Sequence, residues 1–374
     1  MAEAKSQAAN SAAHTIAGRP RFGNLGAAPL GPRWAIHYGG PQNTSTRSRG
    51  LFRGSGFFPT GPLGLSEFEL IARYFSAGPV RREDVLLGVG DDAALLQVPA
   101  GHEVVSAIKT IVGGVHFQRD ANLRALGHRA LAMALSRLAA AGAAPAWLSL
   151  ALTMPDADAA WLDGFSQGLI PLAQRFGMQL IGGDTTRGPL SITVVASGLV
   201  PCGKALQRRG ARVGDLIYVT GTLGEAGLAL LSAQGVIHPP QAARARFQAR
   251  LDWPEPRIPE GRLLCGLATA TNDLPSGLTV GLSEILEASA VGATLHAVQL
   301  PVSPETRPWL AAAGGWHLAL CGAADYELCF TVPTSKQAAV EAAFSETTSG
   351  CTWIGIVEKA LGLRCLLEDG SLIN

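Results

Sequence analysis

Two clusters of acidic residues beside glycines contain the side chains best suited to bind a metal ion. Gly88-Val89-Gly90 leads into Asp91 and Asp92, and Gly182-Gly183 leads into Asp184, which two threonines and an arginine follow. Carboxylate oxygens are ligands that Mg²⁺ takes together with water and substrate phosphates. Glycines allow a backbone to approach a ligand closely. The clusters therefore predict a site for Mg²⁺ and a phosphate-bearing substrate, although a polar surface turn would give the first cluster the same composition.

Familiar motifs for nucleotides and nucleophiles do not account for these residues. Gly88–Ala93 matches the dinucleotide pattern G-x-G-x-x-A, but its two carboxylates stand where a pyrophosphate needs backbone N–H groups. Gly164–Gly168 matches the nucleophile pattern G-x-S-x-G, but the apolar residues around it have helical spacing, whereas that motif requires a strand and a sharp turn. The pattern G-x-x-x-x-G-K-S/T is absent from the sequence. Any nucleotide site must therefore be built differently.

The composition is that of a globular protein and argues against two classes of partner. The 374 residues are 47% hydrophobic and 16% charged, which is typical of a chain with a large core and two domains. The 30 basic and 29 acidic residues nearly cancel, so no excess of positive charge favours nucleic acid. Glycine, proline or a charge interrupts each apolar stretch before the roughly 18 to 20 residues that span a bilayer. We therefore expect neither a nucleic-acid partner nor a membrane helix.

The cysteines indicate a reducing compartment. All six lie in the second half of the chain, and no two have C-x-x-C spacing. Neither their density nor their spacing is typical of a disulfide scaffold or a zinc site. We predict reduced, mostly buried thiols of a cytoplasmic protein at Cys202, Cys265, Cys321, Cys329, Cys351 and Cys365.

Residues 1–63 differ from the rest of the chain. They contain one acidic and seven basic residues among many Ala, Gly, Ser and Pro, without sustained periodicity. This composition predicts a disordered basic leader. A transit peptide would need an amphipathic stripe, which is not evident, and an over-long reading frame would give the same composition. The remaining chain is predicted to form an N-terminal domain over 64–202 and a C-terminal domain over 203–374.

The pattern of strands and helices predicts an α/β protein with α+β layers. Ser66 and Glu69 form a capping-box pattern at the start of a first helix. Because strands and helices alternate, a helical bundle is excluded, and both acidic clusters are expected at strand ends. Helices are predicted over about 121–141, 157–176, 241–251, 259–270 and 278–289 and after residue 221, and strands over 85–90, 103–108, 147–154, 178–181, 191–200, 214–221, 293–300, 327–332 and 352–357.

Several segments, taken together, resemble the thiamine-monophosphate kinase family, which belongs to the aminoimidazole-ribonucleotide synthetase superfamily. They occur in the family's order and approximate spacing from residue 65 to near the C-terminus, over about four fifths of the chain. The segments are Phe68–Phe75, Gly88–Leu95, Val115–Phe117, Leu148–Pro155, Gly182–Gly188, Gly214–Gly221 and Asp325–Phe330.

The resemblance implies an ATP-dependent transfer of a phosphoryl group to thiamine monophosphate, which gives thiamine diphosphate. It also implies two α/β domains, of which the N-terminal one pairs strands across a homodimer. In the family, carboxylates near the dimer cleft hold several Mg²⁺ ions around the ATP phosphates. Such a site agrees with the positioning and charge neutralisation that phosphoryl transfer requires. The resemblance assigns His116 to the substrate, Gly182, Gly183, Asp184 and Arg208 to the nucleotide and its phosphates, and Asp92, Asp273 and, more weakly, Asp91 to metal.

Other family ligands are replaced although their neighbours remain. Lys109 stands where the family has the acid of a Ser/Thr-Thr-Asp run, and Arg137 stands at the acid of Asn-Leu-Ser-Asp. Ser276 replaces the second acid of Asp-x-Ser-Asp-Gly, and Ala324 replaces the glutamate of Gly-Gly-Glu-Asp-Tyr-Glu. The replaced positions are Ala107, Ile108, Lys109, Arg137, Pro275, Ser276 and Ala324.

These replacements make the site much more positive than the family pattern. Lys109 and Arg137 each reverse a charge, and Ser276 and Ala324 each remove a negative one. Two like unit charges about 4 Å apart repel by about 4 kcal/mol at an effective dielectric near 20, so Mg²⁺ should be largely excluded beside the new bases. We therefore predict a family member whose kinase activity is strongly impaired or lost.

Several alternatives remain open. The new bases could form salt bridges with Asp91, Asp92 and Asp184, or they could bind phosphate in place of metal. The chain could be a fully active thiamine-monophosphate kinase that uses its remaining aspartates, or a metal-independent protein that binds thiamine phosphate or nucleotide. A different phosphate acceptor within the superfamily is disfavoured by the segments Phe68–Phe75 and Asp325–Phe330.

Overall fold

The computed structural model describes residues 73–75, 80–118, 120–156, 158–310 and 315–373. The predicted leader over 1–63 lies outside these residues. Most of the helix predicted from Ser66 also lies outside them, and of this helix Arg73 and Tyr74 are described and helical. Among the helices of the described segments, none is long and apolar enough to cross a membrane.

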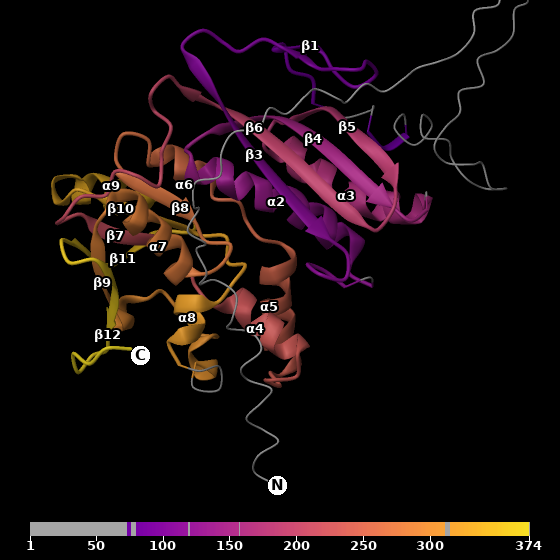
Figure 1. Cartoon of the computed structure of the whole chain (residues 1–374). Helices are drawn as coiled ribbons and strands as arrows, with labels where there is room; N and C mark the ends of the chain where they lie inside the picture. The colour runs from indigo at the N-terminus through magenta and orange to yellow at the C-terminus, as the bar shows by residue number, and fades with distance from the viewer. Residues whose placement is uncertain (1–72, 76–79, 119, 157, 311–314, 374) are drawn as a thin grey trace, which may run out of the picture. The chain divides into compact units, whose positions relative to one another are not determined.

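The first part of the described chain forms a four-stranded sheet with two helices packed against it (Figure 1). Its elements are β1 (Val85–Leu87), β2 (Leu95–Leu96), β3 (His102–Val112), α2 (Leu123–Ala140), β4 (Ala144–Met154), α3 (Ala159–Arg175), β5 (Gln179–Arg187) and β6 (Ser191–Pro201). The strand order is β3-β6-β4-β5, in which β6 pairs antiparallel with both neighbours and β4 and β5 are parallel. β1 and β2 form a separate antiparallel pair.

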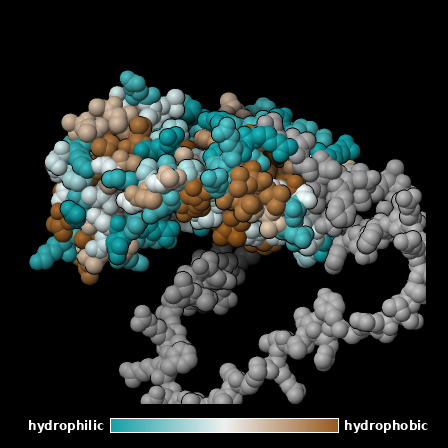
Figure 2. Space-filling view, turned by 90° about the horizontal axis from the view of Figure 1, so that it is seen from above, coloured by the Kyte–Doolittle hydropathy of each residue, from teal (hydrophilic) through white to brown (hydrophobic). Residues whose placement is uncertain are grey.

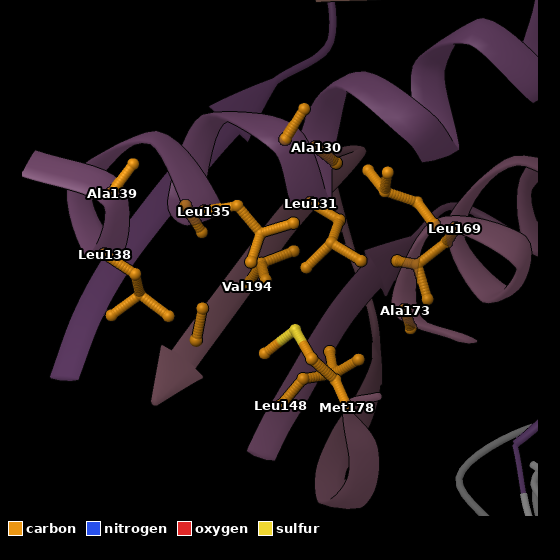
Figure 3. Close-up of a cluster of buried hydrophobic side chains, with 14 of the residues drawn as sticks. Ala130, Leu131, Leu135, Leu138, Ala139, Leu148, Leu169, Ala173, Met178 and Val194 are labelled. Atoms are coloured by element: carbon orange, nitrogen blue, oxygen red, sulfur yellow. The ribbon is translucent and has the colours of Figure 1, made fainter. Parts of the chain in front are cut away.

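The core beneath α2 follows from the spacing of its leucines. Leu131, Leu135 and Leu138 are fully buried and recur on one side of the helix. They lie over the sheet near Leu148 of β4 and Val194 of β6, as Figure 3 shows. The apolar periodicity of the sequence therefore fixes which face of α2 is buried.

Two glycines allow α2 and α3 to approach closely. A Cβ atom on Gly127 would lie 2.0 Å from the carbonyl oxygen of Phe165, and one on Gly168 would lie 1.8 Å from that of Arg124. Both distances are far below van der Waals contact, so no larger residue fits this crossing without a shift of backbone. The G-x-S-x-G pattern at Gly164–Gly168 is part of α3, as its helical spacing predicted.

The second part of the described chain contains a six-stranded sheet. Its strands and α-helices are β7 (Leu216–Thr220), α4 (Glu225–Ala233), α5 (Gln241–Asp252), α6 (Ile258–Leu263), β8 (Ala270–Asp273), α7 (Leu278–Ser289), β9 (Gly292–His296), α8 (His317–Cys321), β10 (Leu328–Val332), α9 (Gln337–Phe344), β11 (Cys351–Glu358) and β12 (Gly362–Leu366), with 3₁₀ turns at Ala297–Gln299, Arg307–Trp309 and Thr334–Lys336. The strand order is β12-β9-β11-β7-β10-β8, and all pairs are antiparallel except β12 with β9. Helix α2 also contacts α6 and β8, so its last turn reaches the strand that ends at Asp273.

Most predicted elements are present within a few residues of their expected bounds, but two expectations were wrong and several short elements were not predicted. Asp184 was expected at a strand end, whereas β5 continues to Arg187 because it pairs with β4 along its length. One helix was predicted over 259–270, whereas α6 ends at Leu263, Gly266 turns the chain with a φ of 81°, and β8 follows. The short elements that were not predicted are β2, β8, β12, α8 and α9.

The cysteines also differ from expectation. All six are free thiols, but only Cys329 and Cys365 are buried. Cys202 and Cys321 are exposed, because each lies where the chain leaves or ends a regular element rather than inside one. The prediction of mostly buried thiols was therefore wrong.

Candidate functional site

The two acidic clusters line one cavity of about 490 Å³, here called the acidic cavity. Asp91 and Asp92 come from the segment between β1 and β2, and Asp184 comes from β5 beside Gly182 and Gly183. All three aspartates are exposed. The fold thus brings together the residues that the sequence paired as a metal and phosphate site.

The two glycines of this cavity have different structural roles. A Cβ atom on Gly183 would lie 1.9 Å from the carbonyl oxygen of Leu150, so the pairing of β5 with β4 requires glycine there. A Cβ atom on Gly182 would meet no atom within 4 Å. Gly182 therefore leaves open space beside the cavity, which is the property expected of a glycine that a ligand approaches.

A second cavity, of about 320 Å³, is here called the basic cavity. Ala107 and Ile108 of β3 form part of its wall, and Arg137 comes from the last turn of α2. Arg208, from the segment between β6 and β7, and Asp273, at the end of β8, complete this group. Five positions singled out by the sequence thus line one cavity, although they are far apart in the chain.

Arg208 is oriented by two polar neighbours. Its Nε donates a hydrogen bond to Oδ1 of Asn272 at 3.0 Å, and its guanidinium forms an ion pair with Glu284 at 3.1 Å. The amide of Asn272 in turn donates to Oε2 of Glu284 at 2.8 Å. These contacts hold the guanidinium in place without burying it, so it can still contact a ligand.

Asp273 contains a buried oxygen without a donor. The residue is 4% exposed, and its Oδ2 atom has no hydrogen-bond partner among the described residues. Burial raises the pKa of Asp273, while the nearby hydroxyl of Ser136 and the positive charges of Arg137 and Arg208 act in the opposite direction. Ser136 Oγ is likewise buried without a hydrogen-bond partner among the described residues, so two unpaired polar groups lie together beside the basic cavity.

Lys109 lies on β3, within electrostatic reach of the same groups. Burial and the charge of Arg137 lower the pKa of Lys109, whereas the charge of Asp273 raises it. The two replacement bases therefore lie close enough for the charge of Arg137 to disfavour the charged form of Lys109. The sequence could not show this proximity, because β3 and α2 meet only in the folded chain.

The salt bridges suggested for the new bases are not found in the described part of the chain. No ion pair there joins Lys109 or Arg137 to Asp91, Asp92 or Asp184. The three aspartates line the acidic cavity, whereas Arg137 lines the basic one. The hypothesis of a single neutralised cleft is therefore wrong for the described chain.

The two cavities differ in their fit to Mg²⁺. The basic cavity does not fit a divalent cation. Its carboxyl group, Asp273, already interacts with the positive charges of Lys109, Arg137 and Arg208, and these charges would repel the cation. The acidic cavity has suitable oxygen donors. However, among the described residues no group of three or more His, Cys, Asp or Glu side chains is arranged to hold a metal ion. The acidic cavity therefore offers carboxylates from Asp91, Asp92 and Asp184 that do not form such a group within the described residues.

His116 lines neither cavity. It follows β3 and is exposed, and its Nδ1 accepts a hydrogen bond from the N–H of Val112 at 3.0 Å. Its carbonyl oxygen accepts a hydrogen bond from Arg129 at 3.2 Å. In this neutral tautomer Nε2 carries the proton, so the ring presents a donor to solvent.

The replaced residues of the two C-terminal motifs meet at one turn. The N–H of Ala324 donates to the carbonyl oxygen of Pro275 at 3.0 Å, and Ser276 lies just before α7. Ala324 and Tyr326 have φ angles of 72° and 53°, which non-glycine residues rarely adopt. The backbone of these motifs is therefore strained around positions that have lost their carboxylates.

Asp325 is used by the fold. Its carboxylate accepts hydrogen bonds from the N–H groups of Gly224 at 2.8 Å and Ala226 at 3.4 Å, at the start of α4. Burial raises the pKa of Asp325 to about 7, against these hydrogen bonds and the charge of Arg250. Asp325 therefore joins its strained turn to a helix and does not point to a ligand.

Glu327 forms a buried cluster that sequence reasoning missed. It is fully buried, accepts hydrogen bonds from Thr220 at 2.6 Å and from two nitrogens of Arg257 at 2.6 Å, and forms an ion pair with Arg250. The signal for it in the sequence was a basic residue, Arg250, near the end of a predicted helix. That position does not identify the partner, which lies 77 residues from Arg250.

Family models match both parts of the chain. The model for the AIR synthase related protein N-terminal domain matches residues 90–200, and that for the AIR synthase related protein C-terminal domain matches residues 212–366. Together they cover Asp91, Asp92, Asp184, Arg137 and Asp273, whereas Arg208 lies between the two matched ranges.

Curated relatives and solved structures extend this likeness over most of the chain. Thiamine-monophosphate kinase of Escherichia coli strain K12 is 44% identical over 314 residues, which are 83% of this chain and 96% of the relative. The enzyme of Haemophilus influenzae strain Rd is 38% identical over 318 residues, with coverages of 83% and 96%. The crystal structure of thiamine-monophosphate kinase from Stenotrophomonas maltophilia K279a aligns with a TM-score of 0.75 at 40% identity, over 83% of this chain and 99% of that one. The structure of AaThiL complexed with AMPPCP and TMP aligns with a TM-score of 0.64 at 26% identity, over 84% and 96% of the two chains.

Proposed function

The chain belongs to the thiamine-monophosphate kinase family, and we propose that it binds thiamine monophosphate and ATP but has strongly impaired or no kinase activity. The family reaction converts ATP and thiamine monophosphate to ADP and thiamine diphosphate and depends on Mg²⁺. The observation that carries the proposal is the presence of Lys109 and Arg137 next to Asp273, where the family pattern has carboxylates.

Individual roles follow the family pattern where the residues survive. We assign His116 to the substrate side, because it presents a ring donor to solvent. We assign Gly182, Gly183 and Asp184 to the nucleotide side of the acidic cavity, which all three line. Gly183 is in addition required by the pairing of β5 with β4. Arg208 is assigned to a phosphate, as its orientation by Asn272 supports. Asp92, Asp273 and, more weakly, Asp91 are the remaining candidates for metal.

Charge is the physical reason for the proposed impairment. Phosphoryl transfer depends on cations that neutralise the developing charge and hold the phosphates in line. Lys109 and Arg137 oppose Mg²⁺ at the basic cavity by about 4 kcal/mol per unit charge at about 4 Å and an effective dielectric near 20. Since 1.4 kcal/mol corresponds to a factor of about ten, the loss of one such ion is sufficient to remove most of the rate.

We further propose a homodimer that covers the open side of the four-stranded sheet. Alternate residues of the edge strand β3 are exposed, among them Val104 at 45% and Ile108 at 57%. Figure 2 shows that hydrophobic residues also gather in one area of the face that it displays. An edge strand with an uncovered apolar side favours pairing with another chain.

Domain limits and location complete the proposal. The division into 64–202 and 203–374 is supported by the end of β6 at Pro201, after which the next strand begins at Leu216. A cytoplasmic location is supported by the six free thiols.

The proposal is tested by measuring thiamine diphosphate formation from thiamine monophosphate, ATP and Mg²⁺. The natural chain is compared with the quadruple variant Lys109→Asp, Arg137→Asp, Ser276→Asp and Ala324→Glu. We expect no turnover, or a very low rate, in the natural chain and a clear gain in the variant. The positive φ of position 324 is already occupied by a non-glycine residue, so glutamate adds little backbone strain there.

The opposite outcome has a clear meaning. Efficient turnover by the natural chain would show that the remaining aspartates suffice, and the proposed impairment would be wrong. The same assay with Arg209→Asp, an exposed residue that does not line the basic cavity, controls for a general effect of added negative charge.

A further inference from the structure

Lys109 and Arg137 are two positive charges that interact with each other and with the carboxyl group of Asp273, but neither forms an ion pair within the described segments. The ion pairs found there include neither side chain. Burial and, after it, the charge of Arg137 lower the pKa of Lys109, and the charge of Asp273 opposes them, so Arg137 disfavours the positive charge of Lys109. An anion between the two side chains would convert this repulsion into attraction on both sides.

The basic cavity provides the space and the remaining contacts for such an anion. Its volume of about 320 Å³ is within the range of small-ligand sites. Arg208 contributes a third basic group, which Asn272 and Glu284 already orient. Because a partner fixes this guanidinium in advance, less side-chain entropy is lost when it contacts a ligand.

We propose that the basic cavity binds the phosphate groups of a phosphate ester or diphosphate directly, without a divalent cation. Arg137 and Arg208, which line the cavity, donate to phosphate oxygens through planar guanidinium groups. Lys109, which follows the lining residue Ile108 on β3 but does not itself line the cavity, adds positive charge from beside it. The choice of a phosphate-bearing ligand rests on the proposed function. The inference goes further, because it assigns to basic side chains of this chain the role that Mg²⁺ has in the family.

Asp273 narrows the kind of ligand that fits. Its buried Oδ2 and the buried hydroxyl of Ser136 beside it both lack a hydrogen-bond partner among the described residues, so the cavity suits a ligand that carries a hydrogen-bond donor next to its phosphate oxygens. A protonated phosphate oxygen or a hydroxyl group meets this requirement. Free Mg²⁺ would also be attracted to Asp273, but it would have to approach Lys109 and Arg137, which repel it.

Titration calorimetry of the full chain with inorganic diphosphate tests the inference. The first titration contains EDTA, and the second contains Mg²⁺ in excess. We expect binding in EDTA, and weaker binding with Mg²⁺, because the metal neutralises the ligand. The double variant Lys109→Gln and Arg137→Gln should bind at least tenfold more weakly in EDTA.

A matched control separates the site from general charge. Lys204→Gln and Arg209→Gln remove two positive charges at exposed positions that do not line the basic cavity. This control should bind diphosphate within about twofold of the natural chain, since exposed charges contribute little. A cooperative thermal unfolding transition confirms that each variant folds. If the double variant does not fold, the single variant Lys109→Gln takes its place in the titration.

Two results would overturn the inference. Binding that requires Mg²⁺ would show that metal still occupies this site, and equal affinities of the double variant and its control would show that diphosphate binds elsewhere. Thiamine monophosphate is titrated in parallel to separate the two proposals. Binding of diphosphate in EDTA without binding of thiamine monophosphate supports the metal-free site while refuting the proposed substrate. Binding of thiamine monophosphate only with Mg²⁺, without binding of diphosphate in EDTA, would support the proposed substrate and refute the metal-free site.

Discussion

Replacement of Glu327 by glutamine should destabilise the protein far more than loss of an exposed ion pair. Glu327 is fully buried between Arg250 and Arg257, whose side chains are 15% and 9% exposed. Glutamine keeps the shape but removes the counter-charge that Arg250 and Arg257 share, which leaves Arg257 with the longer ion pair to Glu260 at 3.9 Å. Breaking a buried ion pair from one side costs about 3–5 kcal/mol, so the free energy of unfolding should fall by about that amount.

Urea-induced unfolding, followed by tryptophan fluorescence, measures this loss. Glu358→Gln is the matched control, because it breaks the ion pair with Arg364, whose two side chains are 37% and 30% exposed. The control should cost less than about 1 kcal/mol. If the two variants unfold at the same urea concentration with equal slopes, Glu327 does not carry the buried charge of this cluster and the argument from its burial is refuted.

Two further predictions concern the packing and the pH dependence of the fold. Gly168→Ala should lower the free energy of unfolding by about 1–3 kcal/mol, because the new Cβ would lie 1.8 Å from the carbonyl oxygen of Arg124. The control Gln167→Ala, on the exposed side of α3, should change the free energy of unfolding by less than about 0.5 kcal/mol in the same urea assay. Equal costs would contradict the close crossing of α2 and α3. Because burial raises the pKa of Asp325 to about 7, the folded state keeps a proton that the unfolded state releases, so the free energy of unfolding should fall as pH rises from about 4 to 7. Asp325→Asn should flatten this dependence, and an unchanged slope between pH 4.5 and 7.5 would show that other groups cause it.

The sequence determined most of the elements and the residues worth examining. Leucines at helical spacing identified α2 and its buried side, and alternating apolar residues located β3, β4 and β6. These patterns are local, because a helix or strand must bury one regularly repeated face. The motif segments were also local, so the replacement of acids by Lys109 and Arg137 was visible in the sequence alone.

Contacts between distant segments were decided only by the tertiary structure. Gly182 and Asp184 were expected at a strand end, but β5 continues past them because its pairing with β4 depends on a strand 25 or more residues earlier in the chain. The separation of the acidic cavity from the basic one likewise depends on how α2 meets β8.

The electrostatics of the site required the same distant contacts. Lys109, Arg137 and Asp273 come from β3, α2 and β8, and their mutual effect on pKa arises only when these three elements meet. Charge interactions fall off with distance through space and not along the chain. The sequence therefore specified which charges had changed, whereas the fold decided that the two new bases lie together beside a buried carboxyl and apart from the surviving aspartates.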